Sequence, residues 1–416
     1  MEILVAAAVL IGFYMAWTIG ANDAANSMAP AVGARALSVK WAVILCAIFE
    51  FSGAVLVGST VTDTIRKGII DSQVFANNPQ ILAYGMACAL LASGVWLHAA
   101  TYLGMPVSTT HSIVGSVAGI GILIAGIDHV YWGTVAQIVL SWVVSPIAGG
   151  IIAFVIFKMI SEGILAKEHP ARSALIGIPV CVFFTFMVVI LVTIFKGLKH
   201  VSFELSWPLA ILASFAGGLV ATAVSVIPAR KILSDAVDLP LADQLVRVEK
   251  IFSVLVVVTA CSVAFAHGAN DVANAIGPLA AVVEIARTNE IPKNVSVEFW
   301  ILALGGMGIA CGLLTYGYKV IQVVGTKITD MTPSRGVAAA MSASVTVLVC
   351  SKLGLPISTT HTLVGAVIGV GLARGITAIN RKIVKSIFTS WIVTLPITAG
   401  LTMLFYGVAS LLGLFK

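Results

Sequence analysis

Charge is scarce in this chain. Only 10% of its 416 residues are Asp, Glu, Lys or Arg, whereas a soluble globular chain carries about 25%. Apolar residues make up 59% of the chain, and the mean hydropathy is +1.06. A single soluble core cannot bury so much apolar surface, so the sequence predicts an integral membrane protein in contact with lipid. The first apolar segment, Ile3–Ile19, has no basic stretch before it and is predicted to be a span, not a cleaved signal.

Several functional motifs are absent. There is no G-x-x-x-x-G-K-[ST] loop to bind ATP and no G-x-S-x-G elbow of a serine hydrolase. The six cysteines are scattered singly in apolar runs, without metal-ligand spacing. The net charge of +6 is spread over short loops, which membrane topology explains better than a nucleic-acid partner. We therefore predict a protein that is not an enzyme and has no cofactor and no nucleic-acid partner. A channel or a structural membrane protein is a further, less favoured class.

Two stretches of the chain occur twice. Gly20–Pro30 returns as Gly268–Pro278 with seven of eleven residues identical, and Leu103–Ile122 returns as Leu353–Leu372 with twelve of twenty identical. A Ser-Trp pair also returns, and all three matches keep nearly the same separation along the chain. Because the three matches occur in the same order and at nearly the same separation along the chain, they indicate that the second half is a duplicate of the first.

Basic residues indicate that the two halves have opposite orientations. The connector after the first S-T-T-H motif, residues 126–132, contains no Lys or Arg, whereas the connector after the second carries Arg374, Arg381, Lys382 and Lys385. Because basic residues stay on the cytoplasmic side, the two connectors should lie on opposite faces of the membrane, with the N-terminus outside. An inverted repeat of this kind predicts a binding site at the repeat interface near the membrane midplane.

The predicted fold is an all-α integral membrane protein of about twelve transmembrane helices at about 20 residues per span. It consists of two inverted-topology repeats, with broken or re-entrant helices at the S-T-T-H motifs. We assign residues 1–160 to the first repeat, 161–246 to two connecting spans and a cytoplasmic linker, and 247–416 to the second repeat. The polar stretch Pro228–Lys250 is predicted to be the loop of that linker.

Each copy of the first motif places an aspartate, Asp23 or Asp271, next to a long apolar run. An intramembrane carboxylate is costly unless it has a partner, so a functional role is the default interpretation. Glycine and an Asn-Asp pair are poor helix-interior residues, which predicts a helix break that frees backbone carbonyls. Carboxylate, amide and carbonyl oxygens suit a hard cation, so we predict sodium ligands at Asn22, Asp23, Asn270 and Asp271. The alternative is a capped helix start with the aspartate as N-cap.

Each S-T-T-H motif follows a proline and precedes an apolar, glycine-spaced stretch, which predicts that a helix begins there. Free N–H groups and hydroxyls at a helix N-terminus favour an anion. Two such ends brought together would surround a tetrahedral oxyanion with donors. The alternative is an ordinary capped helix start. His111 and His361 are interpreted mainly as structural, with a proton relay as the alternative. His98 and His267 are interpreted as core histidines.

Glu50 lies alone in an apolar segment, and a loose local pairing places Ile309 opposite it in the other half. A buried intramembrane glutamate is predicted to bind the coupling cation or to join a charge network, with a purely structural role as the alternative. Hardly any Lys or Arg lies near the predicted site, and Lys352 is the nearest in sequence. Two aspartates and an anion without compensating charge would be very unfavourable in a dry interior. Cations must therefore enter with the anion.

The sequence closely resembles the inorganic phosphate transporter (PiT) family in motifs from both halves, at Gly20–Asn26, Ile48–Gly53, Thr64–Asp71, Pro106–His111, Gly268–Asn274 and Pro356–His361. The resemblance implies a homodimeric, twelve-span protein of the cell membrane that moves phosphate with sodium or protons and has an outside N-terminus. It also implies that phosphate is bound by Ser108, Thr109, Thr110, Ser358, Thr359, Thr360, Asn26 and Asn274. The long central loop of animal members is absent here.

The function predicted from the sequence is phosphate import by symport with a cation, through alternating access. Sodium is favoured over protons because carboxylate and carbonyl oxygens suit it. A carrier of sulfate or a related oxyanion on the same scaffold is the alternative, since hydroxyl and N–H donors suit either anion.

Overall fold

The computed structural model describes residues 1–58, 69–197, 205–291, 297–352 and 357–414. Residues 64–68 and Pro356 of the sequence motifs lie outside this part of the chain. The described residues are almost entirely helical and contain no strand, only an isolated bridge between Ile70 and Val130. The α-helices are α1 Glu2–Ile19, α2 Ala25–Gly33, α3 Val39–Val57, α5 Pro79–Tyr102, α6 Thr109–Ile124, α7 Trp132–Ile160, α8 Pro170–Gly197, α9 Trp207–Ser234, α10 Leu241–Asp271, α11 Ala273–Thr288, α12 Phe299–Tyr316, α13 Tyr318–Gln322, α14 Pro333–Lys352, α15 Thr359–Arg374 and α16 Arg381–Leu411.

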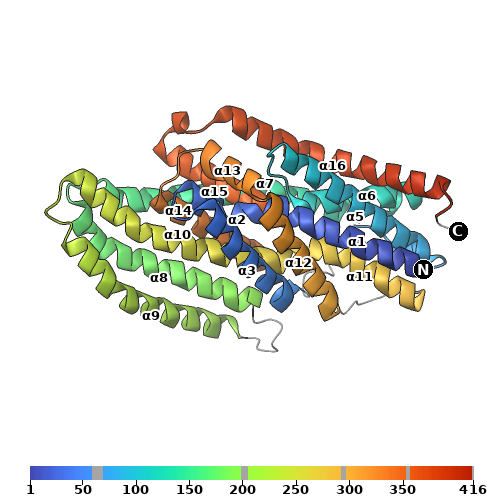
Figure 1. Cartoon of the computed structure of the whole chain (residues 1–416), viewed down its shortest axis with the longest axis horizontal. Helices are drawn as coiled ribbons and strands as arrows, with labels where there is room; N and C mark the ends of the chain where they lie inside the picture. Colours follow the sequence, from blue (N-terminus) through green and yellow to red (C-terminus); the bar gives the residue numbers. More distant parts are fainter. Residues whose placement is uncertain (59–68, 198–204, 292–296, 353–356, 415–416) are drawn as a thin grey trace.

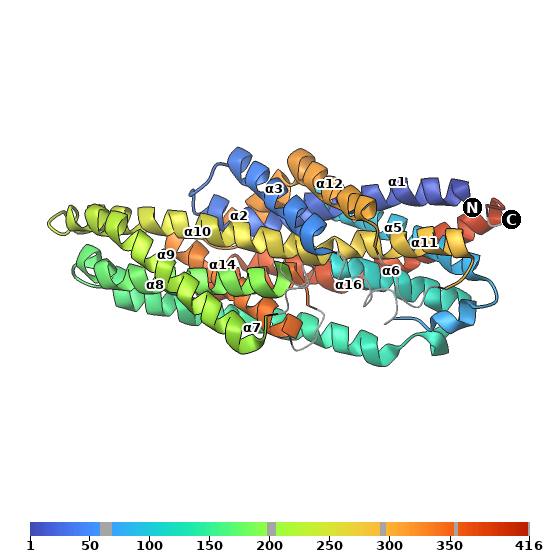
Figure 2. The same ribbon diagram turned by 90° about the horizontal axis from the view of Figure 1, so that it is seen from below.

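The helices form an elongated bundle, and most of them run along its long axis (Figures 1 and 2). Ten helices in the described ranges are long and apolar enough to cross a membrane. Two shorter helices, α6 and α15, begin within the S-T-T-H motifs, and the serine that caps each of them is buried. This confirms the predicted all-α membrane fold, while the predicted number of twelve spans stays a prediction.

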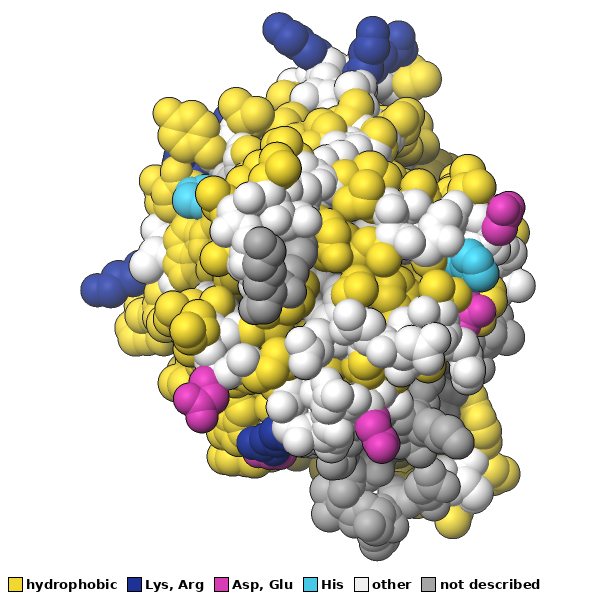
Figure 3. All heavy atoms as spheres, turned by 90° about the vertical axis from the view of Figure 1, so that its right-hand side faces the viewer, with side chains coloured by type: hydrophobic (Ala, Val, Ile, Leu, Met, Phe, Trp, Pro, Cys, Tyr) yellow, Lys and Arg dark blue, Asp and Glu magenta, His cyan; other side chains and the backbone are white. Residues whose placement is uncertain are grey.

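The outer surface of the bundle is largely apolar. On α9, for example, Leu212, Val220 and Val224 are all exposed. Charged side chains are scattered over the end of the molecule that carries both termini, with hydrophobic groups between them (Figure 3). So much exposed apolar surface is typical of a protein that is embedded in lipid.

The two halves of the chain are interleaved and do not form separate bodies. Helix α7 of the first half packs along α15 and α14 of the second, and α16 of the second half packs along α6 and α5 of the first. Likewise α1 packs on α12, and α10 packs on α3. Most of the extensive helix contacts around the centre therefore join one half to the other.

Helices α1 with α2 and α10 with α11 form two long rods that run in opposite directions (Figure 1). Each rod touches a neighbouring helix backbone through the glycine that opens its motif. A Cβ atom at Gly20 would lie 1.9 Å from the carbonyl oxygen of Ile309, and one at Gly268 would lie 2.2 Å from the carbonyl oxygen of Glu50. Only glycine permits such approaches. The two motifs therefore have equivalent backbone surroundings.

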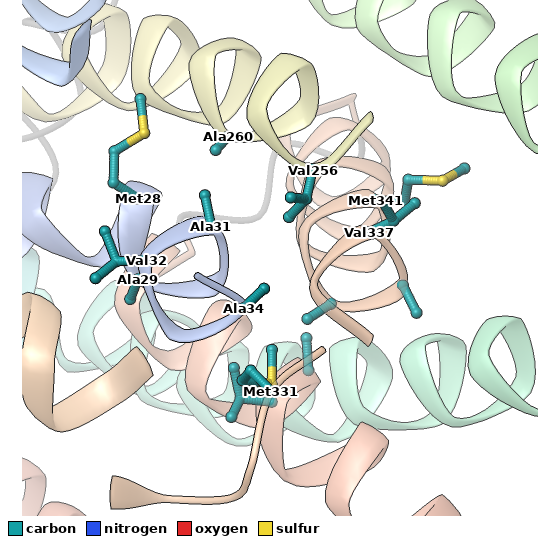
Figure 4. Close-up of a cluster of buried hydrophobic side chains, with 14 of the residues drawn as sticks. Met28, Ala29, Ala31, Val32, Ala34, Val256, Ala260, Met331, Val337 and Met341 are labelled. Carbon is teal, nitrogen blue, oxygen red and sulfur yellow. The ribbon is translucent and has the colours of Figure 1, made fainter. Parts of the chain in front are cut away.

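Small and flexible apolar side chains fill the space between α2, α10 and α14. Met28 and Ala31 of α2 lie near Ala260 and Val256 of α10, with Val337 of α14 beside them (Figure 4). These residues belong to one buried cluster. Alanine allows the helix backbones to approach closely, which holds the motif helices at a fixed distance from one another.

The predicted helix break at the first motif is wrong. The chain stays helical through Gly20–Ala24 and forms a π-helical turn, a feature that is frequent at functional sites. In the second motif Val272 also keeps helical angles between α10 and α11. Asn22 and Asp23 bond to other segments, so their side chains do not compete for their own backbone. The N-cap of α2 is Ala24, so Asp23 does not cap it.

The predicted loop Pro228–Lys250 is also wrong. Helix α9 continues to Ser234 and α10 begins at Leu241, which leaves only residues 235–240 between them. Pro228 lies inside α9. The stretch is rich in Ala, Arg, Lys, Leu, Gln and Glu, which are strong helix formers, so both helices continue beyond the apolar core.

Candidate functional site

The carboxylate of Asp23 lies at the N-terminus of α6. Its Oδ2 accepts hydrogen bonds from the backbone N–H of Thr109 at 3.2 Å and from the Thr109 hydroxyl at 2.6 Å. Its Oδ1 accepts a hydrogen bond from the hydroxyl of Thr360, in the other half. Asp23 is 2% exposed. The first motif therefore bonds the S-T-T residues of both halves.

The carboxylate of Asp271 has a different set of partners. Its Oδ2 accepts a bond from the Thr359 hydroxyl at 2.9 Å, and its Oδ1 accepts bonds from the side-chain amides of Asn270 at 3.0 Å and Asn274 at 3.3 Å. Thr110 is the equivalent of Thr360, yet within the described residues it donates no hydrogen bond to Asp271. Among the described residues, the Asp271 carboxylate bonds an S-T-T residue of its own half, Thr359, and none of the other half.

His267 fills the space between the carboxylates. Its Nδ1 lies 2.8 Å from Glu50 Oε2, and its Nε2 lies 2.8 Å from Asp271 Oδ2 and 3.6 Å from Asp23 Oδ1. One ligand atom from each of Asp23, His267 and Asp271 lies within 4.8 Å of the other two, an arrangement that could hold a metal ion. The structure thus brings Glu50 and both aspartates into one buried cluster.

The interpretation of His267 as an ordinary core histidine misses this central position. A signal was present in the repeat. His267 corresponds to Ile19 in the first motif, and Glu50 corresponds to Ile309 by the glycine contacts. These are two places where one half has a polar residue and the other an isoleucine, and the two polar residues contact each other.

The asparagines of the first motif bind the S-T-T-H segments. The Asn22 side-chain amide donates to the Thr101 hydroxyl and to the carbonyl of Met105, both at 2.9 Å, and its Oδ1 accepts from the N–H of Val107 at 3.0 Å. Asn22 therefore fixes the segment before α6. The Asn26 amide donates to the Thr360 hydroxyl at 2.9 Å, while its Oδ1 is buried without a partner.

The serines of the two S-T-T-H motifs cap helices. Ser108 Oγ accepts from the N–H of His111 at 3.4 Å, and Ser358 Oγ accepts from the N–H of His361 at 3.2 Å. Both serines are N-caps with extended backbone angles. A cap satisfies one of the free donors at a helix start. Ligand binding by these serines remains a prediction.

Two histidines and two tryptophans join the S-T-T-H motifs across the halves. His361 stacks on Trp391 with ring centroids 3.5 Å apart, and its Nδ1 lies 3.2 Å from the carbonyl oxygen of Trp142. Trp391 Nε1 donates to the carbonyl of Pro106 at 3.1 Å. The rings of His111 and His361 lie 4.2 Å apart. These contacts agree with the structural role expected for the two histidines.

A small cavity of about 20 Å³ adjoins Asp23 and His267. A cavity of about 10–15 Å³ holds one water molecule, so this one is water-sized. The sequence analysis did not identify Ser27 and Ser344, whose side chains line it. Its apolar side is formed by residues of α8, α10 and α14, including Val192 and Leu348. The space beside Asp23 and His267 is smaller than an oxyanion.

Three carboxylates and one histidine are the ionisable groups of this cluster, with Cys46 Sγ at 4.0 Å from Glu50 Oε1. No Lys or Arg pairs with them in the described part of the chain, and the side chain of Lys352 lies outside it. Such a cluster is strongly biased toward negative charge and would be stabilised by bound cations.

The apolar helices and the buried polar centre define a multi-pass membrane protein. Comparison with known proteins specifies the class further. The family model described as the phosphate transporter family matches residues 19–402. The chain is 46% identical over 405 residues to a protein of Thermococcus kodakarensis named "putative phosphate permease", and the match covers 97% of both chains.

Two other similar proteins also have names that refer to phosphate transport. The chloroplastic inorganic phosphate transporter 2-1 of Arabidopsis thaliana is 41% identical over 431 residues, which cover 97% of this chain and 72% of that protein. A solved structure named the sodium-dependent phosphate transporter has a TM-score of 0.88 and 44% identity, and the match covers 99% of this chain and all of that one. The chain belongs to the phosphate transporter family, which is not an enzyme family, so the predicted family is confirmed.

Proposed function

We propose that this chain carries inorganic phosphate together with sodium into the cell by alternating access. Membership of the phosphate transporter family and the similarity to a structure named for sodium-dependent phosphate transport support this function. The names of the related proteins favour phosphate over sulfate as the substrate.

The observation that carries the proposal is the charge of the buried cluster. Glu50, Asp23 and Asp271 are 0%, 2% and 1% exposed, and His267 is the basic group between them. An oxyanion added to this cluster would meet further negative charge in a medium of low dielectric constant, where like charges repel strongly. Phosphate can enter only if cations enter with it. This argument favours symport over a simple anion pathway.

Residues of both motifs share the two tasks in this proposal. Sodium is bound by the oxygens of Asn22, Asp23, Asn270, Asp271 and Glu50, because a hard cation prefers oxygen ligands. Phosphate is bound by the S-T-T residues at 108–110 and 358–360, with Asn26 and Asn274. A proton, carried by one of the buried carboxylates, is the alternative coupling ion.

Alternating access is supported by the small volume of the cavity. A water-sized cavity cannot hold phosphate, so the helices that line it must move apart to admit the anion, and in alternating access they do so on one side at a time. The interleaved packing implies that a motion of the repeat over 1–160 against the repeat over 247–416 also shifts α7 and α16, which pack on the opposite half. Residues 161–246, with α8 and α9, connect the two repeats.

The proposed setting is the cell membrane, with the N-terminus outside and the basic connectors inside. The apolar outer faces contact lipid, and two copies of the chain form a homodimer. Inverted topology of the repeats is supported by the antiparallel course of α1–α2 and α10–α11 (Figure 1).

Uptake into proteoliposomes tests the function. Purified protein is reconstituted, and labelled phosphate uptake is measured with an inward sodium gradient at equal pH, then with a pH gradient in sodium-free buffer. Accumulation under the sodium gradient alone supports sodium symport, and accumulation under the pH gradient alone supports the proton alternative. Equal uptake without either gradient would contradict symport. Unlabelled sulfate that competes as well as unlabelled phosphate would contradict phosphate selectivity.

A further inference from the structure

The donors expected to bind the anion are already bonded to the carboxylates expected to bind the cation. Thr109 gives both its hydroxyl proton and its backbone N–H to Asp23, and Thr360 gives its hydroxyl proton to the same carboxylate. Thr359 gives its hydroxyl proton to Asp271. The two carboxylates therefore occupy the donor cage as internal anions.

A threonine hydroxyl has a single proton to donate. While Thr109, Thr359 and Thr360 donate to a carboxylate, they cannot donate to phosphate. Hydrogen bonds to an ionised acceptor are also roughly twice as strong as neutral ones. Phosphate must therefore compete with two fixed carboxylates for the same protons.

The amide of Asn26 is oriented by the same network. Thr360 donates to Asp23, so its oxygen accepts the proton from the Asn26 amide. One N–H of the Asn26 amide is therefore engaged as well, and the Asn26 Oδ1, an acceptor, has no partner. In this arrangement the site offers an incoming anion fewer donors than its residue types suggest.

We propose that Asp23 and Asp271 block the phosphate cage until sodium binds them, so that sodium binds before phosphate. Sodium on a carboxylate weakens its hold on the threonine protons, and the released hydroxyls then turn to the phosphate oxygens. The coupling resides in the exchange of hydrogen-bond acceptors by Thr109, Thr359 and Thr360. This inference rests on the proposed function and specifies its order of binding.

The unequal partner sets make the inference quantitative. Asp23 holds two hydroxyls and one backbone N–H, whereas Asp271 holds one hydroxyl and two side-chain amides. Removing the Asp23 carboxylate should release more threonine hydroxyls than removing the Asp271 carboxylate. Glu50 offers a matched control, because it belongs to the same charged cluster but bonds His267 and no threonine in the described residues.

Equilibrium binding of labelled phosphate to the purified full chain tests the order. Affinity is measured in sodium and in an equal concentration of N-methylglucamine, and the ratio of the two dissociation constants is the sodium dependence. The wild type should bind phosphate detectably only in sodium, so its sodium dependence is the lower limit set by the weakest binding that the assay detects. Asp23→Ala should bind it in both buffers, with the sodium dependence reduced by about 10- to 100-fold for each released hydroxyl, the value of a charge-assisted bond.

Three other variants separate donor release from loss of charge. Asp271→Ala should lower the sodium dependence less than Asp23→Ala. Asp23→Asn keeps an oxygen acceptor for the threonine protons, so its sodium dependence should lie between those of the wild type and Asp23→Ala. Glu50→Gln removes a charge without releasing a hydroxyl, so its sodium-free phosphate binding should stay undetectable. If Asp23→Ala is not recovered as a folded protein, Asp271→Ala compared with Glu50→Gln decides alone.

The possible failures are distinguishable. A wild type that does not bind phosphate in sodium would contradict the proposed function itself. A wild type that binds in sodium, with an Asp23→Ala variant that still requires sodium, would overturn the acceptor exchange and leave symport intact. Equal sodium-free binding by Asp23→Ala, Asp23→Asn and Glu50→Gln would also overturn it, because charge alone would then explain the effect.

Discussion

The two motif regions share a backbone frame but differ in polarity. At the first crossing Gly20 touches the backbone of Ile309, and at the second Gly268 touches the backbone of Glu50. Ile19 and Ile309 are fully buried in one apolar cluster. At the equivalent places of the other crossing stand His267 and Glu50, in contact at 2.8 Å.

The comparison separates two kinds of constraint. The frame, made of glycine contacts and helix caps, is preserved in both halves because both must pack in the same way. The polar groups are concentrated at one crossing, where Glu50 of the first half and His267 of the second create a charged centre beside the shared site. Asp23 and Asp271 also differ, since Asp23 bonds threonines of both halves and Asp271 bonds a threonine of its own half.

The largest expected effect is on transport and tests whether the aspartates are equivalent. Asp23→Asn should lower sodium-driven phosphate uptake by about 100- to 1,000-fold, since disrupting a buried charged network costs about 3–5 kcal/mol. The loss of uptake in Asp271→Asn should be about tenfold smaller than the loss in Asp23→Asn, because among the described residues Asp271 bonds threonine only from its own half. Initial uptake rates in proteoliposomes, normalised to reconstituted protein, measure both. Equal losses would contradict the functional asymmetry.

A second prediction makes the two crossings alike. His267→Ile alone should destabilise the protein by about 3–5 kcal/mol, because it leaves Glu50 buried without a partner. The double variant Glu50→Ile/His267→Ile copies the isoleucine pair at the other crossing and should recover most of that stability. It should still fail to accumulate phosphate with sodium.

Thermal unfolding in detergent, arranged as a double-mutant cycle, measures the coupling of Glu50 and His267. Additive losses from the two single variants would show that their contact does not stabilise the fold. Sodium-driven uptake by the double variant would show that the contact between Glu50 and His267 is dispensable for transport.

A third prediction concerns the shared frame and expects no difference between halves. Gly20→Ala and Gly268→Ala should each destabilise the protein by about 1–3 kcal/mol or more, since the added Cβ overlaps a carbonyl oxygen. Gly407→Ala is the control, because a Cβ there meets no atom within 4 Å. Thermal unfolding measures all three. A clear loss in only one motif variant would show that the frames are not equivalent.

The smallest expected effect concerns a serine that only the first motif has. Ser27 lines the cavity, and its counterpart in the second motif is Ala275. Ser27→Ala should raise the phosphate concentration for half-maximal uptake by up to about tenfold, the value of one hydrogen bond. Ala275→Ser is the matched control and should change it little. A larger effect of Ala275→Ser would place the anion nearer the second motif.

Much of the fold could be predicted because it follows from composition and repetition. Apolar runs predict spans, and the Pro-x-Ser-Thr-Thr sequence predicts helix starts at Thr109 and Thr359, where α6 and α15 begin. The loop expected at Pro228–Lys250 failed because polar residues with high helix propensity extend a helix as readily as they form a loop.

The contacts within the site could be predicted only in part. Glu50 and the two aspartates were expected in the site because an intramembrane carboxylate is costly unless it has a partner, which makes a functional role the default interpretation. The position of His267 was missed, because an isolated histidine in an apolar run has no local signal. The bond from Thr360 to Asp23 joins residues far apart in the chain and crosses the repeat boundary. Its existence depends on how the two halves pack, which no local pattern encodes.

The contact between Glu50 and His267 has a consequence for the ancestry of the chain. In an assembly of two identical half-length subunits, every substitution appears twice, so this pair would stand at both crossings. Two such pairs would double the buried charge at the centre. Once both halves are fused in a single polypeptide, each can change alone. One crossing can then carry the charged pair, with one residue from each half, while the other crossing keeps its isoleucines. This difference between the crossings is available only after fusion.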